Sequence, residues 1–127
     1  MMTELKPGDP VRARYKSGEY AGILVEASGP RAVVEIRAVL SHPLQGDLHH
    51  PYEADVPLFH QRRALAYREK ALVPKADIEP FAGEIPDYAD SLRQAVKREL
   101  DRLAAMDGQW ARMAERSLRE LEQDYFK

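Results

Sequence analysis

The segment PFAGEIP, residues 80–86, separates two parts of the chain whose apolar residues recur at different intervals. Before it, apolar and polar residues alternate as they do in half-buried strands. After it, apolar residues recur at every third or fourth position, as they do on one face of a helix. Prolines and a glycine so close together are typical of a break between elements. We therefore predict a β part, residues 1–83, followed by a helical part, residues 84–127.

Three predicted strands follow one another near the N-terminus. Val11, Ala13 and Tyr15 alternate with arginines, and the next two runs are Tyr20–Ala27 and Arg31–Leu40. Short turns containing glycine join them, which is typical of an antiparallel meander. Tyr15 and Tyr20 flank the first turn, and we expect them to be half-buried strand aromatics rather than a cage for a cationic ligand.

Two further strands are predicted at Ala64–Arg68 and Ala71–Val73, with a tight turn at Pro74–Asp77. A short helix is the alternative for this region, because Ala, Leu, Arg, Glu and Lys favour helices. Strands of this number and length can close on themselves, which removes the exposed edges of a sheet. The predicted fold class is therefore mostly β with α, a small SH3-like β-barrel followed by helices.

The helical part is predicted to be an antiparallel hairpin. Asp87 suits the N-cap of the first helix, and Gly108, in the segment Met106–Gln109, ends it. The two apolar stripes are Ala89, Leu92, Val96, Leu100 and Leu103, then Trp110, Ala114, Leu118, Leu121 and Tyr125. Helices joined by so short a link pack against each other. We expect the apolar faces of the two helices to pack against each other and against the barrel. The alternative is that they form a coiled-coil seam with a helix of a partner protein.

Charge and composition exclude several classes of function. The net charge is −2, and acidic and basic residues are balanced in both parts, so no nucleic-acid partner is expected. The chain has no cysteine, which excludes disulfides, thiol nucleophiles and thiolate zinc sites. No apolar run approaches the length of a membrane span, and the polar start MMTELKPGDP does not resemble a signal peptide. A cytoplasmic location is expected.

All four histidines lie in one window, three of them in SHPLQGDLHHP, residues 41–51, and the fourth at His60. Asp47, Glu53 and Asp55 could complete a metal site with them. The histidine spacing, however, does not place ligands on one side of a helix or strand. A pair such as His49 with Asp55 could act as a general base, yet no nucleophile elbow or phosphate loop accompanies it. We therefore expect no catalytic residue, no metal and no cofactor.

Two neighbouring segments have features of a binding surface. The polar connection from Ser41 to Glu53 is long for a small barrel, and long loops tend to be functional. The segment VPLFHQRRALAYREK, residues 56–70, then combines aromatic and arginine side chains, which are the usual anchors of protein interfaces.

The segments RARYKSGEYAGILVEA, HPLQGDLH, FHQRRALAYRE and AERSLRELEQDY together resemble the kinase-associated protein B family over nearly the whole chain, from about Gly8 to Tyr125. The resemblance implies a non-enzymatic accessory protein that assists a membrane sensor histidine kinase feeding the phosphorelay that controls sporulation. It also implies an SH3-like barrel with a helical extension. The family is described as a lipoprotein, and here the sequence departs from it, because no cysteine is available to carry a lipid. Membrane association is expected only through the kinase.

The resemblance also directs attention to the polar and aromatic members of the family segments. The residues proposed to contact the partner are His42, Gln45, Asp47, His49, Phe59, His60, Arg62, Arg63, Tyr67 and Arg68. Arginines there could pair with kinase carboxylates, and Phe59 could fill an apolar pocket. Three alternatives stay open, namely an SH3-like module that binds nucleic acid or the ribosome, an enzyme that uses a metal at the histidines, and a homo-oligomer.

Overall fold

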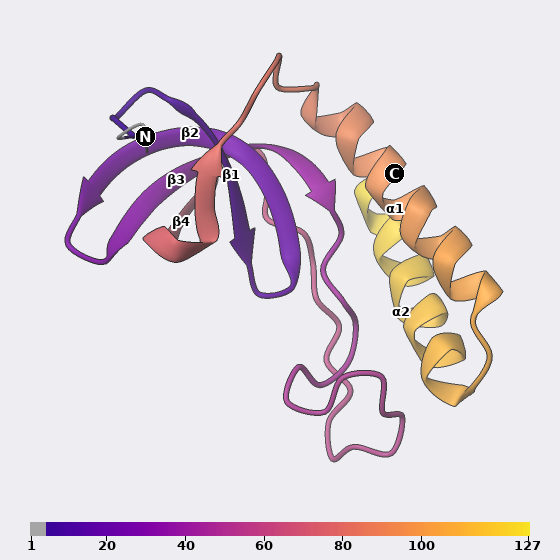
Figure 1. Ribbon diagram of the computed structural model, residues 1–127. Coiled ribbons are helices and arrows are strands. Elements are labelled where there is room, and N and C mark those ends of the chain that lie inside the picture. The colour runs from indigo at the N-terminus through magenta and orange to yellow at the C-terminus, as the bar shows by residue number, and fades with distance from the viewer. Residues whose placement is uncertain (1–4) are drawn as a thin grey trace.

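The computed structural model describes residues 5–127, so the expectation for the N-terminal segment lies partly outside it, at residues 1–4. Five strands, a short 3-10 helix and two α-helices form the regular structure (Figure 1). In chain order they are β1 (Pro10–Tyr15), β2 (Gly18–Ser28), β3 (Arg31–Ser41), β4 (Lys70–Pro74), η1 (Lys75–Asp77), β5 (Ile78–Pro80), α1 (Tyr88–Ala105) and α2 (Gln109–Tyr125).

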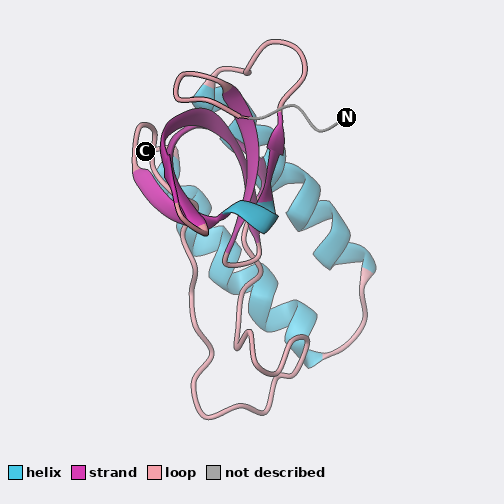
Figure 2. Cartoon of the chain, turned by 60° about the vertical axis from the view of Figure 1, so that its left-hand side comes forward, coloured by secondary structure: helices cyan, strands magenta, loops and turns pink. Residues whose placement is uncertain are grey.

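The strands form one antiparallel sheet in the order β4-β3-β2-β1-β5. The sheet curls strongly, and Figure 2 shows it nearly end-on, so that the strands trace a ring. Irregularities in the β2–β3 pairing, one of them between Ala21 and Gly22, permit this curvature. At Gly22 the backbones approach so closely that a Cβ atom would lie 2.2 Å from the carbonyl oxygen of Glu35, so only glycine fits there.

The predicted fold class, mostly β with α, is confirmed, but the sheet is open and not a closed barrel. Its two edges are β4 and β5, which follow each other along the chain and are joined by η1. Strand β4 contains the predicted strand Ala71–Val73, and η1 lies within the predicted turn. Strand β5 was not predicted, because three residues ending in proline carry little strand signal.

The predicted strand Ala64–Arg68 is wrong, because this segment is irregular. Two of its backbone N–H groups donate hydrogen bonds to side chains and not to a neighbouring strand. The N–H of Ala64 donates to the Tyr125 hydroxyl, and the N–H of Leu65 donates to the Tyr20 hydroxyl. The segment then turns, and Arg68 N–H donates to the carbonyl of Ile36 at 2.6 Å. Tyr20, whose own position in the sheet is fully buried, therefore supports this segment and is not part of a ligand cage.

The antiparallel helical hairpin has the predicted boundaries. Asp87 is the N-cap of α1 and accepts a hydrogen bond from the N–H of Asp90 at 3.1 Å. Gly108, at φ 106°, precedes α2. Helix α1 lies on β3, where the Ser91 hydroxyl accepts a buried hydrogen bond from the N–H of Val39. Neither helix combines the length and apolar character that a membrane span requires, within residues 5–127.

One apolar core joins the sheet and the hairpin. Its members come from every strand but β5 and from both helices, and they include Leu24, Ile36, Val96, Leu103 and Leu118, all nearly inaccessible to solvent. The division into domains at residue 83 stays a prediction.

Residues 42–69, which we call the long connection, join β3 to β4 without a helix or strand. The long connection runs away from the sheet, turns, and returns beside the hairpin (Figures 1 and 2). All ten residues proposed to contact a partner lie on it, so its attachment to the hairpin decides which of them are exposed.

Candidate partner-binding surface

His42 fixes the start of the long connection to the end of α2. Its side chain is buried, with Nδ1 3.0 Å from the carbonyl oxygen of Pro43 and Nε2 2.9 Å from the Tyr125 hydroxyl. A carbonyl oxygen only accepts, so Nδ1 carries the proton, and Nε2 accepts the Tyr125 proton. The Tyr125 oxygen in turn accepts the N–H of Ala64 at 2.8 Å. One hydroxyl thus joins both ends of the long connection to α2.

The environment of His42 favours its neutral form. Burial lowers its pKa below the ordinary value, while the hydrogen bond to Pro43 and the charge of Glu99 oppose this shift. Burial also raises the pKa of Tyr125, so its hydroxyl keeps the proton that it donates. The two groups therefore form an uncharged structural clamp, and His42 is not exposed to a partner.

Gln45 forms a second attachment and is also buried. Its amide nitrogen donates to the carbonyl of Arg62 at 3.0 Å, and its amide oxygen accepts from the N–H of Arg62 at 3.0 Å. The same oxygen accepts from the hydroxyl of Ser117 on α2 at 2.8 Å. Gln45 thus satisfies the backbone of the returning segment as a neighbouring strand would, and links it to α2.

Aromatic side chains pack around the next turn. Gly46 has φ 102°, a backbone conformation that favours glycine, and a Cβ atom there would lie 3.1 Å from both Phe59 Cε2 and Trp110 Nε1. Phe59 is half-buried against the core. Beyond this turn, Tyr52 stacks edge-on against Trp110, with ring centroids 4.7 Å apart. The far end of the long connection therefore lies against the start of α2.

Arg62 and Arg63 both use their guanidinium groups in contacts with other residues of this chain. A terminal nitrogen of Arg62 donates to the carbonyl of Gly46 at 3.1 Å, and its Nε is buried with no hydrogen-bond partner among residues 5–127. The Arg63 guanidinium pairs with Asp124 and lies over the Tyr125 ring, 5.0 Å from its centroid. Arg63 lowers the pKa of Asp124 through this hydrogen bond. A partner's carboxylate would have to compete with these contacts.

The other two histidines named from the sequence are exposed. His49 and His60 lie near Asp47, whose carboxylate accepts the N–H of His49 at 2.9 Å. This hydrogen bond lowers the pKa of Asp47, so the carboxylate stays charged. No three His, Asp or Glu side chains in residues 5–127 gather closely enough to hold a metal ion.

Tyr67 and Arg68 lie on the outer side of a tight turn and are the most accessible aromatic and basic members of the set. Tyr67 is 54% exposed and packs at a tilt against Tyr88 of α1, with centroids 5.8 Å apart. Arg68 has φ 70°, an uncommon value for a residue with a side chain. Its guanidinium lies 3.7 Å from the carboxylate of Glu35.

The structure thus divides the residues that sequence reasoning proposed as partner contacts into buried, half-buried and exposed groups, and their role in binding stays a prediction. Buried His42 and Gln45 hold the long connection in place. Asp47, Phe59 and Arg62 are half-buried, and the exposed members of the set are His49, His60, Arg63, Tyr67 and Arg68. The partners on the helices, Tyr125, Ser117 and Tyr88, were missed as site residues. Tyr125 was visible only as the last member of an apolar stripe, and Ser117 gave no signal because its role depends on a glutamine distant in the chain.

Comparison with known proteins agrees with this architecture. A family model described as "Kinase associated protein B" matches residues 15–126. "Kinase-associated lipoprotein B" of Bacillus subtilis (strain 168) is 42% identical over 125 residues, covering 98% of each chain. The crystal structure of kinase-associated protein B from Bacillus cereus has a TM-score of 0.82 and 30% identity, covering 96% of this chain and 98% of that one. The chain belongs to the kinase-associated protein B family.

Proposed function

We propose that the chain is a non-enzymatic accessory protein that binds a protein kinase and regulates it. The observation that carries this proposal is membership of the kinase-associated protein B family over nearly the whole length, including both parts of the fold. The finer proposal is that the kinase is a membrane sensor histidine kinase that feeds the sporulation phosphorelay. The proposed location is cytoplasmic, with contact with the membrane through that kinase.

The long connection supports this proposal because it is an ordered surface rather than a loose loop. The His42–Tyr125 and Gln45–Ser117 contacts fix its start to α2, and the Ala64–Tyr125 contact fixes its returning segment. A pre-organised loop loses less conformational entropy when a partner binds, so more of the contact energy appears as affinity. The proposed contacts with the kinase are therefore the exposed residues His49, His60, Tyr67 and Arg68, together with the half-buried Asp47 and Phe59.

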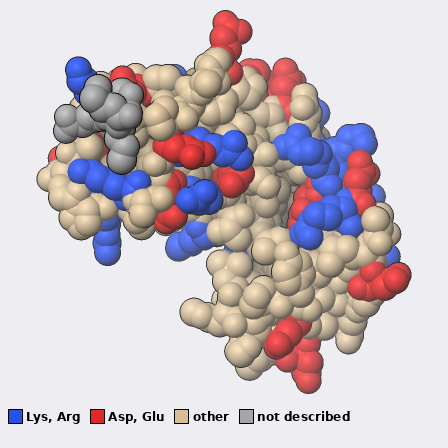
Figure 3. Space-filling model, in the orientation of Figure 1, with Lys and Arg blue, Asp and Glu red and all other residues tan. Residues whose placement is uncertain are grey.

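Charge favours a protein partner over a nucleic acid. Blue and red side chains are mixed over the sheet and the hairpin in Figure 3, and the lower part of this face is mostly uncharged. Many of the basic groups are paired within the molecule, such as Arg12 with Glu19 and Arg102 with Glu99. A phosphate backbone attracts a continuous basic surface, which this face does not provide. The absence of a nucleic-acid partner stays a prediction.

A kinase assay tests the proposed function directly. The cytoplasmic part of the kinase, or the whole kinase in nanodiscs, is incubated with labelled ATP with and without this protein, and autophosphorylation is followed in time. We expect a concentration-dependent change in rate that saturates, together with direct binding in a co-sedimentation measurement. The protein alone should consume no ATP. Neither binding nor a change in rate at saturating protein would contradict the proposal.

Variants locate the contact without disturbing the fold. Charge reversal at Arg63 is a poor probe, because Arg63 also pairs with Asp124 and covers Tyr125. His60→Ala and His49→Ala change exposed side chains, and Lys97→Ala on the outer side of α1 is a matched surface control. We expect the histidine variants to weaken kinase binding and the control to leave it unchanged, with all three keeping the wild-type thermal midpoint.

A further inference from the structure

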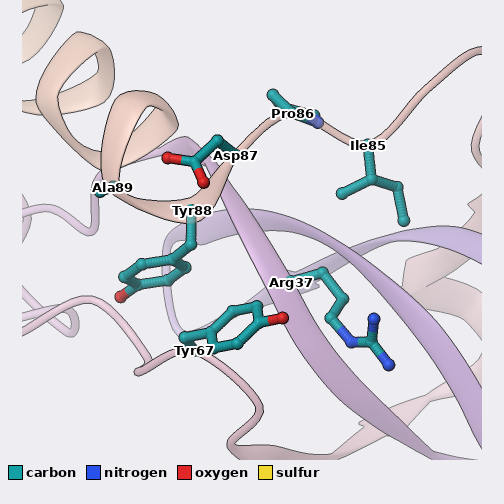
Figure 4. A pocket seen from close by; sticks show the side chains of 7 residues that line it. All are labelled: Arg37, Tyr67, Ile85, Pro86, Asp87, Tyr88 and Ala89. Carbon is teal, nitrogen blue, oxygen red and sulfur yellow. The ribbon is translucent and has the colours of Figure 1, made fainter.

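A groove of about 520 Å³ lies between the Tyr67 turn and the segment that leads into α1. Figure 4 shows its arrangement, with Tyr67 and Arg37 on one wall, and Ile85, Pro86 and Asp87 on the other. Tyr88 closes the groove between them, beside Tyr67. The groove is open to solvent along its length, and its walls are mostly aromatic, aliphatic and proline side chains. Such walls suit an extended peptide segment, because aromatic grooves bind proline-containing peptides by surface contact.

Arg37 lines the groove beside Tyr67, whereas Arg68 and Glu69, which follow Tyr67 in the chain, are not among its lining residues. Arg37 and Arg68 both face one carboxylate, that of Glu35, with nitrogen to oxygen distances of 2.7 and 3.7 Å. The Glu35 side chain is only 13% exposed, whereas that of Arg68 is 67% exposed. One carboxylate thus serves two guanidinium groups, and Arg68 keeps unused donors toward solvent. In Figure 4 the Tyr67 hydroxyl also points toward Arg37, so a carboxylate placed there would meet further donors.

The opposite wall carries Asp87 and, nearby in the chain, Glu84. The Asp87 carboxylate is already used as the N-cap of α1, where it accepts the N–H of Asp90 and faces the positive end of the helix. Its charge is therefore partly compensated within the molecule. The free binding capacity for a charged group lies on the arginine side, which favours an acidic ligand over a basic one.

The turn that presents Tyr67 and Arg68 is rigid. Backbone hydrogen bonds hold it on both sides, with Arg68 N–H donating to Ile36 and Ile36 N–H donating to Glu69 at 2.8 Å. The Tyr88 hydroxyl donates to the carbonyl of Leu65, and burial raises the pKa of Tyr88 to about 12, so this donor persists at neutral pH. A left-handed backbone at Arg68 persists only where the surroundings impose it, and such strain concentrates at binding sites.

We propose that this groove binds an acidic, proline-containing extended segment of the kinase. In this arrangement, the proline or a neighbouring aliphatic side chain lies against Tyr67, Tyr88 and Pro86, and a carboxylate pairs with Arg68 and Arg37. The proposal rests on the proposed function in taking the segment from the kinase. It adds to that function the place of contact and the chemistry of the recognised segment.

Two synthetic peptides test the chemistry, the acidic Ac-AEPLEPA-NH2 and its basic counterpart Ac-AKPLKPA-NH2, each titrated into the isotope-labelled protein and followed by NMR. We expect the acidic peptide alone to shift the amide signals of residues 35–37, 65–69 and 84–89. Arg68→Gln and Arg37→Gln should remove these shifts. Arg31→Gln, at the far end of the same strand as Arg37, is the matched control and should keep them. Shifts from the basic peptide only, or from neither peptide, would overturn the proposal.

Kinase binding by the same variants separates this proposal from the proposed function. We expect Tyr67→Ala combined with Arg68→Gln to weaken kinase binding at least about tenfold, as loss of an aromatic and arginine anchor does. If the wild-type protein binds the kinase and this variant binds equally well, the groove proposal fails and the proposed function stands. If the wild-type protein neither binds nor affects the kinase, the proposed function fails whatever the peptides do.

The chain itself has an acidic, proline-containing segment, EADVP at residues 53–57 on the exposed end of the long connection, so a second copy is the competing occupant. Sedimentation of the wild-type protein and the Tyr67→Ala, Arg68→Gln variant over a range of concentrations decides between the two. We expect both to sediment as the same species. Self-association that the variant abolishes, with unchanged kinase binding, would assign the groove to a second copy and overturn the proposal.

Discussion

Replacing Tyr125 with phenylalanine tests the clamp between α2 and the long connection. The change removes one oxygen atom that accepts the Ala64 N–H at 2.8 Å and donates to His42 Nε2 at 2.9 Å. Each buried group left without a partner costs about 1–3 kcal/mol, and water can reach part of this half-buried site. We therefore expect the free energy of unfolding to fall by about 2 kcal/mol.

Urea denaturation gives this quantity. Trp110 is the only tryptophan, and it reports on the start of α2. With a typical slope of about 2 kcal/mol per molar urea for a small domain, the midpoint should fall by about 1 M. Tyr67→Phe is the matched control, because it removes a hydroxyl from an exposed ring, and it should change stability by less than about 0.5 kcal/mol. Equal midpoints for the two variants would refute the clamp.

A double-mutant cycle with His42→Leu isolates the His42–Tyr125 bond. Once His42 is replaced, the Tyr125 hydroxyl keeps only the hydrogen bond from the Ala64 N–H. Tyr125→Phe should therefore lower the free energy of unfolding less in the His42→Leu variant than in the wild-type protein. We expect a coupling energy of about 1 kcal/mol between the two sites. A coupling energy near zero, with both single variants destabilised, would mean that each residue acts through other contacts.

Four further predictions concern the same region. Gln45→Leu should lower stability by about 2–4 kcal/mol in the urea assay, because the backbone of Arg62 and the Ser117 hydroxyl lose their partner. Gly46→Ala should destabilise by more than about 1 kcal/mol, since the residue has φ 102° and a Cβ would press against the Phe59 and Trp110 side chains; a wild-type midpoint would show that the turn relaxes freely. The free energy of unfolding should fall as the pH drops below 6.5, because burial lowers the pKa of His42, so the unfolded chain takes up a proton there at a higher pH than the folded chain does. The stabilisation is complete above pH 6.5 and is lost below it at up to about 1.4 kcal/mol per pH unit. His42→Leu should flatten this slope. Tyr52→Ala should change Trp110 fluorescence while lowering stability by less than about 1.5 kcal/mol, and an unchanged spectrum would contradict the stacking of these rings.

Periodicity predicted most of the regular structure because strands and helices are local. The alternation at Val11–Tyr15 and the stripe from Leu92 to Leu103 record which side of an element is buried, and the structure has β1 and α1 there. The segment Ala64–Arg68 has the residues of a strand but not its pairing, because its N–H groups bond to the side chains of Tyr125 and Tyr20. The composition of a short segment carries no information on hydrogen-bond acceptors so distant in the chain.

The partner contacts stay a prediction, but the exposure of the proposed residues can be compared with the structure. Aromatic and arginine groupings near Tyr67 can be read from a short segment, and this segment does form an exposed turn. The buried positions of His42 and Gln45 depend on Tyr125 and Ser117, which approach only after the hairpin has folded back. The groove beside Tyr67 was not predicted, because its other wall is the proline segment that served only as a boundary in the sequence.

The bond between His42 and Tyr125 spans 83 positions of the chain, and this sets the order in which the molecule can be completed during synthesis. The sheet strands β1–β3 leave the ribosome early, but the long connection gains its attachments to α2 only after that helix has emerged. Contacts so distant in sequence form late, because closing the intervening chain costs entropy before any contact forms. The part of the proposed kinase-binding surface that rests on α2 is thus assembled last. A nascent or truncated chain that lacks the end of α2 would keep the contacts of the Tyr67 turn with β3 but lose the attachment of the rest of the long connection.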